Sequence, residues 1–324
     1  MEFPEEDSPA QPEPAVNQFD WFDQTKYNRI QEGHIVRYVH CTAGRILGKK
    51  ESIWEKILKS RQVTHPNLLW FPFKSEAEWK LGYWLATCKS SQSKINELLD
   101  MYGVLAKQPS FNRASNLCGM VENDLPEMGG PNWFHQKIGP DEFPEAKHED
   151  LTLWLWHLED CGDYLIGRPD LSGEVIFGPE VILADNEEIQ IINEMPTGKR
   201  WHQLTCSQEA AGVDPDAALG GILLGSNKTH LMHYAGDVKV HALYMSLGNI
   251  KKDIRSQTSK RAWMLITHCL FHFCMETICQ PLKELNVHKI IDPDGNSRLI
   301  FYVLLAYLAD LEEQYLISAL DKSN

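Results

Sequence analysis

The chain has 324 residues, of which 43% are hydrophobic, and a formal net charge of −14. A chain of this size and composition can bury one large core or two smaller ones, as a globular protein does. The most apolar run, Leu299 to Leu308, has about half of the roughly 20 residues that cross a membrane. We therefore expect no membrane partner.

The first 24 residues are predicted to form a disordered acidic tail. Met1 to Asp23 carries seven acidic residues and neither Lys nor Arg, which is the opposite of a basic secretory leader. The chain also has eight cysteines, and without such a leader they are expected to be reduced thiols. We expect a nuclear or cytoplasmic protein that is not secreted and has no disulfide framework.

Residues 25–104 are predicted to be mainly helical. The segment from Ser52 to Arg61 places its apolar residues on one face of a short amphipathic helix. Further along, Ser75 and Glu78 have the spacing of a capping box, in which each side chain bonds a free backbone amide at a helix start. A helix should therefore begin directly after Ser75.

Two helices joined by the polar run Lys89 to Ser91 would form a helix-turn-helix. Ser93 and Lys94 lie at the start of the second helix, where the side chains of a recognition helix enter a DNA groove. A plain helical hairpin with no DNA contact is the alternative.

Residues 105–150 are predicted to be a linker or a loosely packed arm, because they are rich in Pro, Gly and acidic residues and lack hydrophobic periodicity. A second domain is predicted over residues 151–324. It begins with a strand in which Leu151, Leu153 and Leu155 share one face.

Two adjacent strands are predicted at Gly221 to Leu224 and at His241 to Leu247. Both are apolar runs, and a polar turn that contains Asp237 separates them. The apolar residues from Ala262 to Leu282 then predict a helix that Pro281 closes.

Five His and Cys residues gather in this predicted helix. His268 and His272 are four residues apart and share a helix face, whereas Cys274 and Cys279 point elsewhere and Cys269 adjoins the first histidine. Structural zinc sites usually take pairs of ligands from loops or turns. We therefore interpret these residues as core thiols and half-buried imidazoles and predict no bound metal.

Two segments of this acidic chain are locally basic, namely Arg45 to Gln62 and Lys228 to Arg261. Such clusters are either solvated faces or contacts for phosphate groups, whose charge Lys and Arg neutralise. The candidate DNA contacts in the second segment are Lys251, Lys252, Arg255, Lys260 and Arg261.

Four motifs follow one another in the second half of the chain: GSNKTHL at 225–231, YMSLGNIKKDIR at 244–255, LFHFCMETICQPL at 270–282 and LLAYLADLEEQYLISAL at 304–320. Together they resemble fungal Plavaka-type (KDZ group) DNA transposases. The resemblance implies an α/β (α+β) fold, in which an incomplete ribonuclease-H-like mixed sheet with helices follows the helical N-terminal region. It also implies double-stranded DNA as a partner and three carboxylates that hold divalent metal ions.

The metal ligands that the resemblance implies are incomplete in this copy. Asn227 stands where the family has the first carboxylate, and an amide brings no negative charge to a pair of metal ions. Asp310 matches the second carboxylate, with capping of the next helix as its alternative role. The chain ends at Asn324, before the region where the family has its third carboxylate. The resemblance therefore implies a truncated and degenerate copy, a pseudoenzyme without a cofactor, for which Mg²⁺ or Mn²⁺ matters only if activity remains.

One further departure from the family pattern concerns charge. Lys199 and Arg200 stand where an acidic and an aromatic residue are usual.

Three functions follow from these observations. The first is a transposase-derived protein that binds double-stranded DNA but does not cut it. The second is a non-catalytic protein-interaction protein with no nucleic-acid role, which uses its ten tryptophans for contacts. The third is an active nuclease built on Asp237, Asp294 or Asp310, although Asp294 lies in a DPDG sequence that is typical of a hairpin connection.

Overall fold

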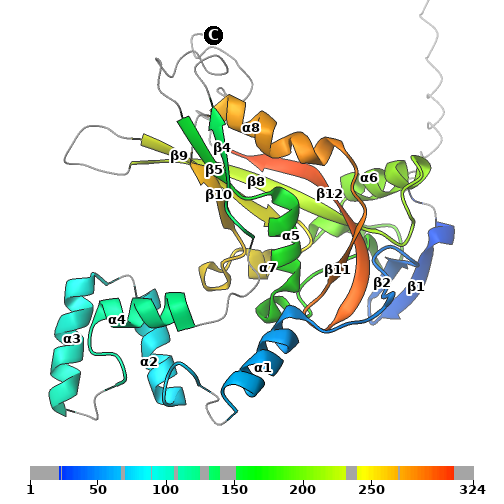
Figure 1. Ribbon diagram of the computed structural model, residues 1–324. Helices are drawn as coiled ribbons and strands as arrows, with labels where there is room; N and C mark the ends of the chain where they lie inside the picture. The colour runs from blue at the N-terminus through cyan, green and yellow to red at the C-terminus, as the bar shows by residue number, and fades with distance from the viewer. Residues whose placement is uncertain are drawn as a thin grey trace, which may run out of the picture. The chain divides into compact units, whose positions relative to one another are not determined.

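The structure is a computed structural model that describes residue 22 and residues 24–66, 70–88, 90–105, 109–124, 131–138, 151–230, 239–268 and 271–309. Helices and strands are mixed along the chain (Figure 1), which confirms the predicted α/β (α+β) class. The chain divides into two compact units. The sheet unit takes in residues 1–47, 173–290 and 298–324, and the helical unit takes in residues 48–172 and 291–297.

The helical unit contains most of the helices and one hairpin. Its elements are β3 (Gly48–Lys49), α1 (Ile53–Thr64), α2 (Glu76–Thr87), α3 (Gln92–Leu105), α4 (Ala114–Gly119), the π-helical turn η2 (Met120–Asp124), β4 (Phe134–Ile138), β5 (Leu151–Leu155), α5 (Leu158–Gly167) and η4 (Pro169–Leu171).

Serine residues cap the first two helices of this unit. The Ser75 hydroxyl accepts the backbone N–H of Glu78 at 3.3 Å, so α2 begins where the capping pattern predicts. The carboxylate of Glu78 accepts the N–H of Lys74 at 3.0 Å instead of that of Ser75. The helix predicted after Ser52 is confirmed as α1, and Ser52 caps it by accepting the N–H of Glu55.

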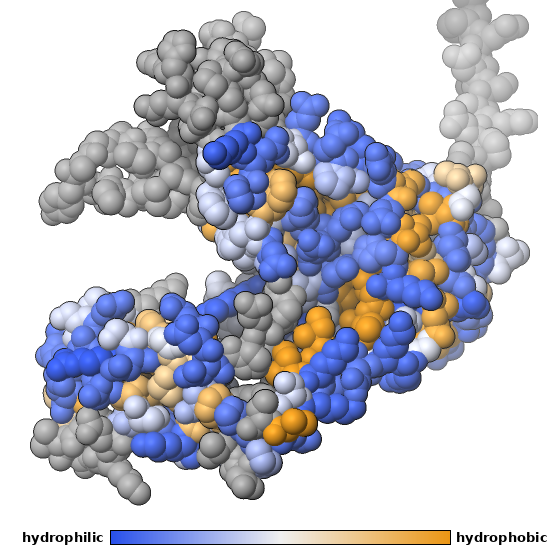
Figure 2. Space-filling view, viewed as in Figure 1, coloured by the Kyte–Doolittle hydropathy of each residue, from blue (hydrophilic) through white to orange (hydrophobic). Residues whose placement is uncertain are grey.

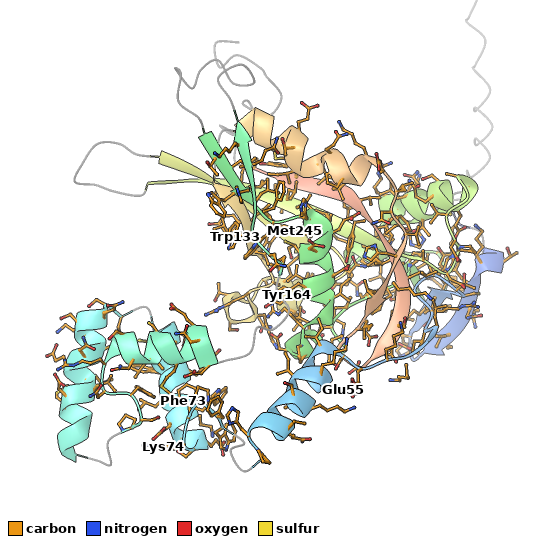
Figure 3. All side chains as sticks on the ribbon, in the orientation of Figure 1. Glu55, Phe73, Lys74, Trp133, Tyr164 and Met245 are labelled. Carbon is orange, nitrogen blue, oxygen red and sulfur yellow. The ribbon has the colours of Figure 1, made fainter. Side chains whose placement is uncertain are left out.

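A hydrophobic core holds α2, α3 and α4 together. Its buried residues are Phe73, Leu85, Ile95, Leu99, Phe111, Ala114 and Leu117. Phe73, labelled in Figure 3, lies so close to Gly82 that a Cβ at this glycine would be 2.8 Å from its ring. Because α4 and β4 both fall within residues 105–150, the segment predicted to be a linker contributes regular structure and core residues to this unit.

The hairpin of β4 and β5 has one buried and one exposed side along β5. Leu153 and Leu155 are buried and Trp154 between them is exposed, as the predicted alternation requires. The predicted strand ends at Leu155, and the residues from Leu158 onward form α5.

A four-stranded antiparallel sheet opens the sheet unit, in the order β1-β2-β6-β7. The burial of Val36, Tyr38 and His40 alternates along β2, which is the period of a strand with one covered face. Part of the segment predicted to be helical is therefore strand. The bounds are β1 (Tyr27–Glu32), β2 (Ile35–His40), β6 (Glu180–Ala184) and β7 (Gln190–Ile191), with the 3₁₀ turn η1 (Gln24–Lys26) before them.

The main sheet of this unit is mixed. Strand β8 (Ala218–His230) pairs antiparallel with β9 (Lys239–Leu247) on one side and parallel with β12 (Asn296–Leu308) on the other. The two adjacent strands predicted from the apolar runs are therefore confirmed, and β8 lies between β9 and β12 (Figure 1). Beyond them lie β10 (Met264–His268), which pairs with β9, and β11 (His288–Ile291), which pairs with β12.

The helix predicted over residues 262–282 is correct only in its second half. Residues 264–268 form strand β10, and α8 (Phe271–Cys279) and the 3₁₀ turn η7 (Gln280–Lys283) follow. Ala262, Met264 and Ile266 are buried at every second position, which is a strand period. A short apolar run fits either structure, and the pairing with β9 decides in favour of a strand.

The described surface in the view of Figure 2 is mainly hydrophilic, with smaller hydrophobic areas. No helix in the described ranges is long and apolar enough to span a membrane. Six cysteines, namely Cys41, Cys88, Cys118, Cys161, Cys206 and Cys279, are free thiols in the described part of the chain.

Candidate functional site

Asn227 lies on the central strand of the main sheet. On one side it pairs with Ala242 of β9. On the other side, the parallel partner β12 ends at Leu308, which pairs with Gly225 of β8. Asp310 follows Leu308 by two residues, as Asn227 follows Gly225, but Asp310 lies outside the described residues. Position 227, where the first carboxylate is predicted, therefore lies on β8. The neighbouring strand β12 ends shortly before Asp310, the second predicted carboxylate.

The aspartates of the DPDG sequence form a hairpin connection between β11 and β12. Asp292 is buried and accepts the backbone N–H groups of Asp294 at 3.1 Å and Asn296 at 2.8 Å. Gly295 adopts a positive φ of 77°, which a side chain would disfavour. Asp294 accepts the Ser172 hydroxyl at 2.8 Å. The predicted turn is confirmed here, and Asp237 lies outside the described residues.

The His and Cys cluster is divided between two elements. His268 ends strand β10, Cys279 ends α8, and Cys269 lies outside the described residues. His272 and Cys274 lie in the first half of α8. Within the described ranges, no group of three or more His, Cys, Asp or Glu side chains is arranged to hold a metal ion.

The predicted cations Lys251 and Arg255 have partners inside the protein. The Lys251 ammonium is 3.0 Å from a carboxylate oxygen of Glu174. The Arg255 guanidinium donates to the carbonyls of Leu247 at 3.3 Å and Ile250 at 2.7 Å. Burial lowers the pKa of Arg255, and attraction to Glu194 opposes that shift. These two side chains therefore hold the loop after β9 in place.

Lys252 differs from these two cations. It is the first residue of the short helix α7 (Lys252–Arg255), and its side chain is exposed. Its backbone N–H donates to the carboxylate of Glu194 at 3.0 Å, which places a negative charge at the start of the helix. Lys260 ends η6 (Thr258–Lys260), and Arg261 follows it with a left-handed backbone at φ 43°.

Ser93 and Lys94 lie in the first turn of α3 and are exposed, as the predicted helix-turn-helix requires. The Lys94 ammonium pairs with the Glu97 carboxylate at 2.9 Å on the same helix. Exposed pairs of this kind are weak, so a phosphate can replace Glu97 at little cost.

A cavity of about 430 Å³ lies in the sheet unit, at the end of β9 that is far from Asn227. Its lining includes Ile192, Glu194, Met195, Arg200, Lys252 and Leu305. Below it, the Trp201 indole is 1% exposed and packs against two glycines. A Cβ at Gly221 would lie 2.7 Å from the Trp201 ring, and one at Gly248 would lie 3.0 Å from it. The absence of side chains at these glycines lets the ring lie against the backbone.

Asn249 fixes the loop beside this cavity. It is fully buried, its amide oxygen accepts the N–H of Gly221 at 3.0 Å, and its amide nitrogen donates to the carbonyls of Leu219 and Ile176 at 2.9 Å. A buried amide with its bonds satisfied specifies one loop conformation. The backbone that presents Lys252 is therefore well defined.

Three exposed cations surround or adjoin the cavity. Lys199 and Arg200 are in the first turn of α6 (Lys199–Ala210), next to Trp201, and Arg200 lines the cavity together with Lys252 of α7. The described part of the chain offers no ion pair or side-chain hydrogen bond to any of the three. Only Lys252 was predicted as a DNA contact, and the unusual charge at positions 199 and 200 was the sequence signal for the other two.

The structure does not bring the predicted cations together with Asn227. Asn227 pairs with Ala242, and Leu247 at the end of β9 is five positions further along the strand. At about 3.4 Å per residue, the two places lie about 17 Å apart along the strand. The sheet thus has two ends, an Asn227 end and a cavity end marked by Lys252.

Comparison with known proteins connects both ends to one family. The family model for the Plavaka transposase matches residues 111–268 and 266–324, which include both ends of the sheet. No curated protein matches the chain, and no solved structure does. Because the family match covers more than half of the sequence, the chain belongs to the Plavaka transposase family.

Proposed function

We propose that this transposase-derived protein binds double-stranded DNA and does not cut it. The observation that carries the proposal is the group of exposed cations at the cavity end, namely Lys199, Arg200 and Lys252. Cations already paired with carboxylates contribute less to DNA binding, because a phosphate must first displace the partner. These three have no such partner in the described part of the chain, although the whole chain has a net charge of −14.

Further contacts are proposed from the basic loop and from the helix-turn-helix. Lys260 and Arg261 continue the basic loop beyond α7, and Ser93 and Lys94 occupy the exposed start of α3. Lys251 and Arg255 act in this proposal by shaping the loop that presents Lys252. The proposed DNA contact therefore depends on fewer side chains than the charge pattern of the sequence indicates.

The absence of cutting is proposed from Asn227. Phosphodiester cleavage by two metal ions needs charged oxygen ligands on both sides of the reacting phosphate. Parallel neighbouring strands such as β8 and β12 suit such a pair of ligands, and in this chain β8 supplies an amide at that position. We propose a ribonuclease-H-like arrangement that lacks the charge to hold two metal ions.

Equilibrium binding of the full chain to a mixed set of duplexes, across a salt series, tests the proposed DNA contact. Affinity should fall steeply as salt rises, because each phosphate contact releases counterions. An Arg200→Gln, Lys252→Gln double variant should show a shallower slope. Absence of binding at low salt, with the protein folded, contradicts the proposal.

The proposed loss of cutting has its own test. Asn227→Asp restores a carboxylate on β8, so Mn²⁺ should bind the variant more tightly than the wild type in calorimetry. The matched control Asn28→Asp makes the same change at an exposed position of strand β1 in the sheet unit, remote in sequence from β8. Equal Mn²⁺ binding by all three proteins would contradict the role given to position 227.

A second candidate function is supported by the aromatic side of the β4–β5 hairpin. Trp133, labelled in Figure 3, is 47% exposed, and Trp154 is 52% exposed. The rings of Trp133 and Trp156 are 4.4 Å apart, and those of His135 and Trp154 are 5.0 Å apart. Exposed aromatic groups are common at protein interfaces, so this surface favours a protein-interaction role. Loss of a co-purified partner on Trp154→Ala would support it.

A further inference from the structure

The cavity end contains more than a group of cations. Ile192, Met195 and Leu305 line the same cavity as Arg200 and Lys252. Ile192 is 64% exposed, and Met195 and Leu305 are half-buried and pack in the hydrophobic cluster that contains Trp201. A surface that served only to attract phosphate groups would need no apolar floor. The site therefore suits a ligand with both a negative and an apolar part.

The volume and the charges define that ligand further. At about 430 Å³, the cavity falls within the range that encloses a small organic molecule. Arg200 and Lys252 offer positive charge from two different elements on its rim. Glu194 is the one carboxylate among the lining residues, and it already accepts a hydrogen bond from the backbone N–H of Lys252. A phosphate next to a flat apolar group satisfies both parts of the site.

We infer that this cavity binds one unpaired nucleotide of a DNA strand, with its phosphate between Arg200 and Lys252 and its base on the floor formed by Met195 and Leu305. The inference rests on the proposed DNA binding and names the form of DNA that the site prefers. A paired base is stacked inside the duplex and cannot reach the floor, whereas an unpaired base offers its apolar face. The protein therefore binds DNA most tightly where one base is free.

The test compares a fully paired duplex with the same duplex carrying a single-nucleotide bulge, by fluorescence anisotropy with the full chain. The wild type should bind the bulged duplex about tenfold more tightly, because covering the apolar face of one base with aliphatic side chains removes that surface from water. In a second arm, a deoxynucleoside 5′-monophosphate should compete for the bulged duplex more strongly than inorganic phosphate at the same concentration.

Two isoleucines supply matched variants. Ile192→Gln changes the rim of the cavity, whereas Ile189→Gln makes the same change at a residue that is 61% exposed and does not line it. Both side chains are at the surface, so both variants should fold. Ile192→Gln should remove most of the preference for the bulge, and Ile189→Gln should keep it. Met195→Gln should act like Ile192→Gln and more strongly, since Met195 lies on the floor.

The outcomes separate this inference from the proposed function. Salt-dependent binding of both duplexes with equal affinity overturns the inference and leaves the proposed DNA binding in place. A bulge preference that survives Ile192→Gln and Met195→Gln overturns the assignment to this cavity. If neither duplex binds at low salt while the protein is folded, both the inference and the proposed function are wrong.

Discussion

The two ends of the main sheet differ in what their function depends on. At the Asn227 end, our proposal makes metal binding depend on the choice between an amide and a carboxylate at this position, and the strand pairing is the same for either. At the cavity end, Trp201 lies against the backbone of Gly221 and Gly248, and Asn249 fixes the loop. The proposed metal binding at the first end depends on one side chain, whereas the proposed DNA binding at the second depends on packing. A sheet of this kind can therefore lose metal binding at one end and keep DNA binding at the other.

The largest effect should follow from removing the packing at the cavity end. Trp201→Ala deletes a fully buried ring and should lower the free energy of unfolding by about 3–5 kcal/mol. Urea denaturation followed by circular dichroism measures this loss. A loss below about 1 kcal/mol would mean that the cavity end is not the tightly packed region described here.

Acid should also weaken the cavity end, through His202 on α6. Its Nε2 donates to the Glu180 carbonyl at 3.0 Å, so the neutral ring accepts the Tyr27 hydroxyl at Nδ1. Burial lowers the pKa of His202 to about 4, against an unfolded value of 6.5. The unfolded chain binds the extra proton first, so stability should be full above pH 6.5 and fall as the pH drops toward 4. The loss should reach about 3 kcal/mol.

Unfolding free energies measured between pH 7 and pH 4 test this effect. His202→Gln keeps a polar side chain without a titrating ring, so its stability should vary less over the same range. His34→Gln is the control, because His34 is an exposed histidine on the same unit. An identical pH dependence in wild type and His202→Gln would contradict the assignment.

A smaller effect should separate the exposed cations from the paired ones. The double variant Arg200→Gln, Lys252→Gln should reduce the slope of log affinity against log salt by about 2, close to one unit for each phosphate contact. Lys251→Gln removes the same kind of charge one residue away, but this lysine is paired with Glu174. Its slope should change little. If Lys251→Gln and Lys252→Gln reduced this slope equally, the distinction between paired and exposed cations would be contradicted.

The smallest effect is expected outside the sheet unit. Trp154→Ala removes an aromatic side chain as large as Trp201, but one that is 52% exposed on the β4–β5 hairpin. The free energy of unfolding should change by less than about 0.5 kcal/mol, and DNA affinity should not change. A loss similar to that of Trp201→Ala would show that the hairpin face is covered in solution by another part of the protein or by a partner.

The parts of the fold that the sequence predicts are those with local causes. Ser75 and Glu78 lie within one helical turn, so their spacing alone predicts the start of α2. The adjacent strands β8 and β9 follow from two apolar runs close together in the chain. Strand β2 lies in a segment that the sequence predicts to be helical, because the helical signals that follow it are stronger than the alternation of Val36, Tyr38 and His40.

The candidate site was less predictable, because its parts come from distant segments. The cavity joins residues near 195, 252 and 305, and nothing in the local sequence of any one of them indicates the other two. Lys251 pairs with Glu174, and Arg255 donates to backbone carbonyls at and just after the end of β9. A count of charges in the sequence cannot predict these contacts. The family motifs do locate Asn227 and its strand, because a motif specifies where a residue lies in the sequence as well as its type.

The most direct test of DNA binding without cutting uses one labelled duplex, the wild-type chain and Mn²⁺ in a single reaction, divided between a native and a denaturing gel. The account predicts a shifted band on the native gel and a full-length strand on the denaturing gel. A nicked strand would contradict the role given to Asn227, and an unshifted duplex at low salt would contradict the role given to Lys199, Arg200 and Lys252.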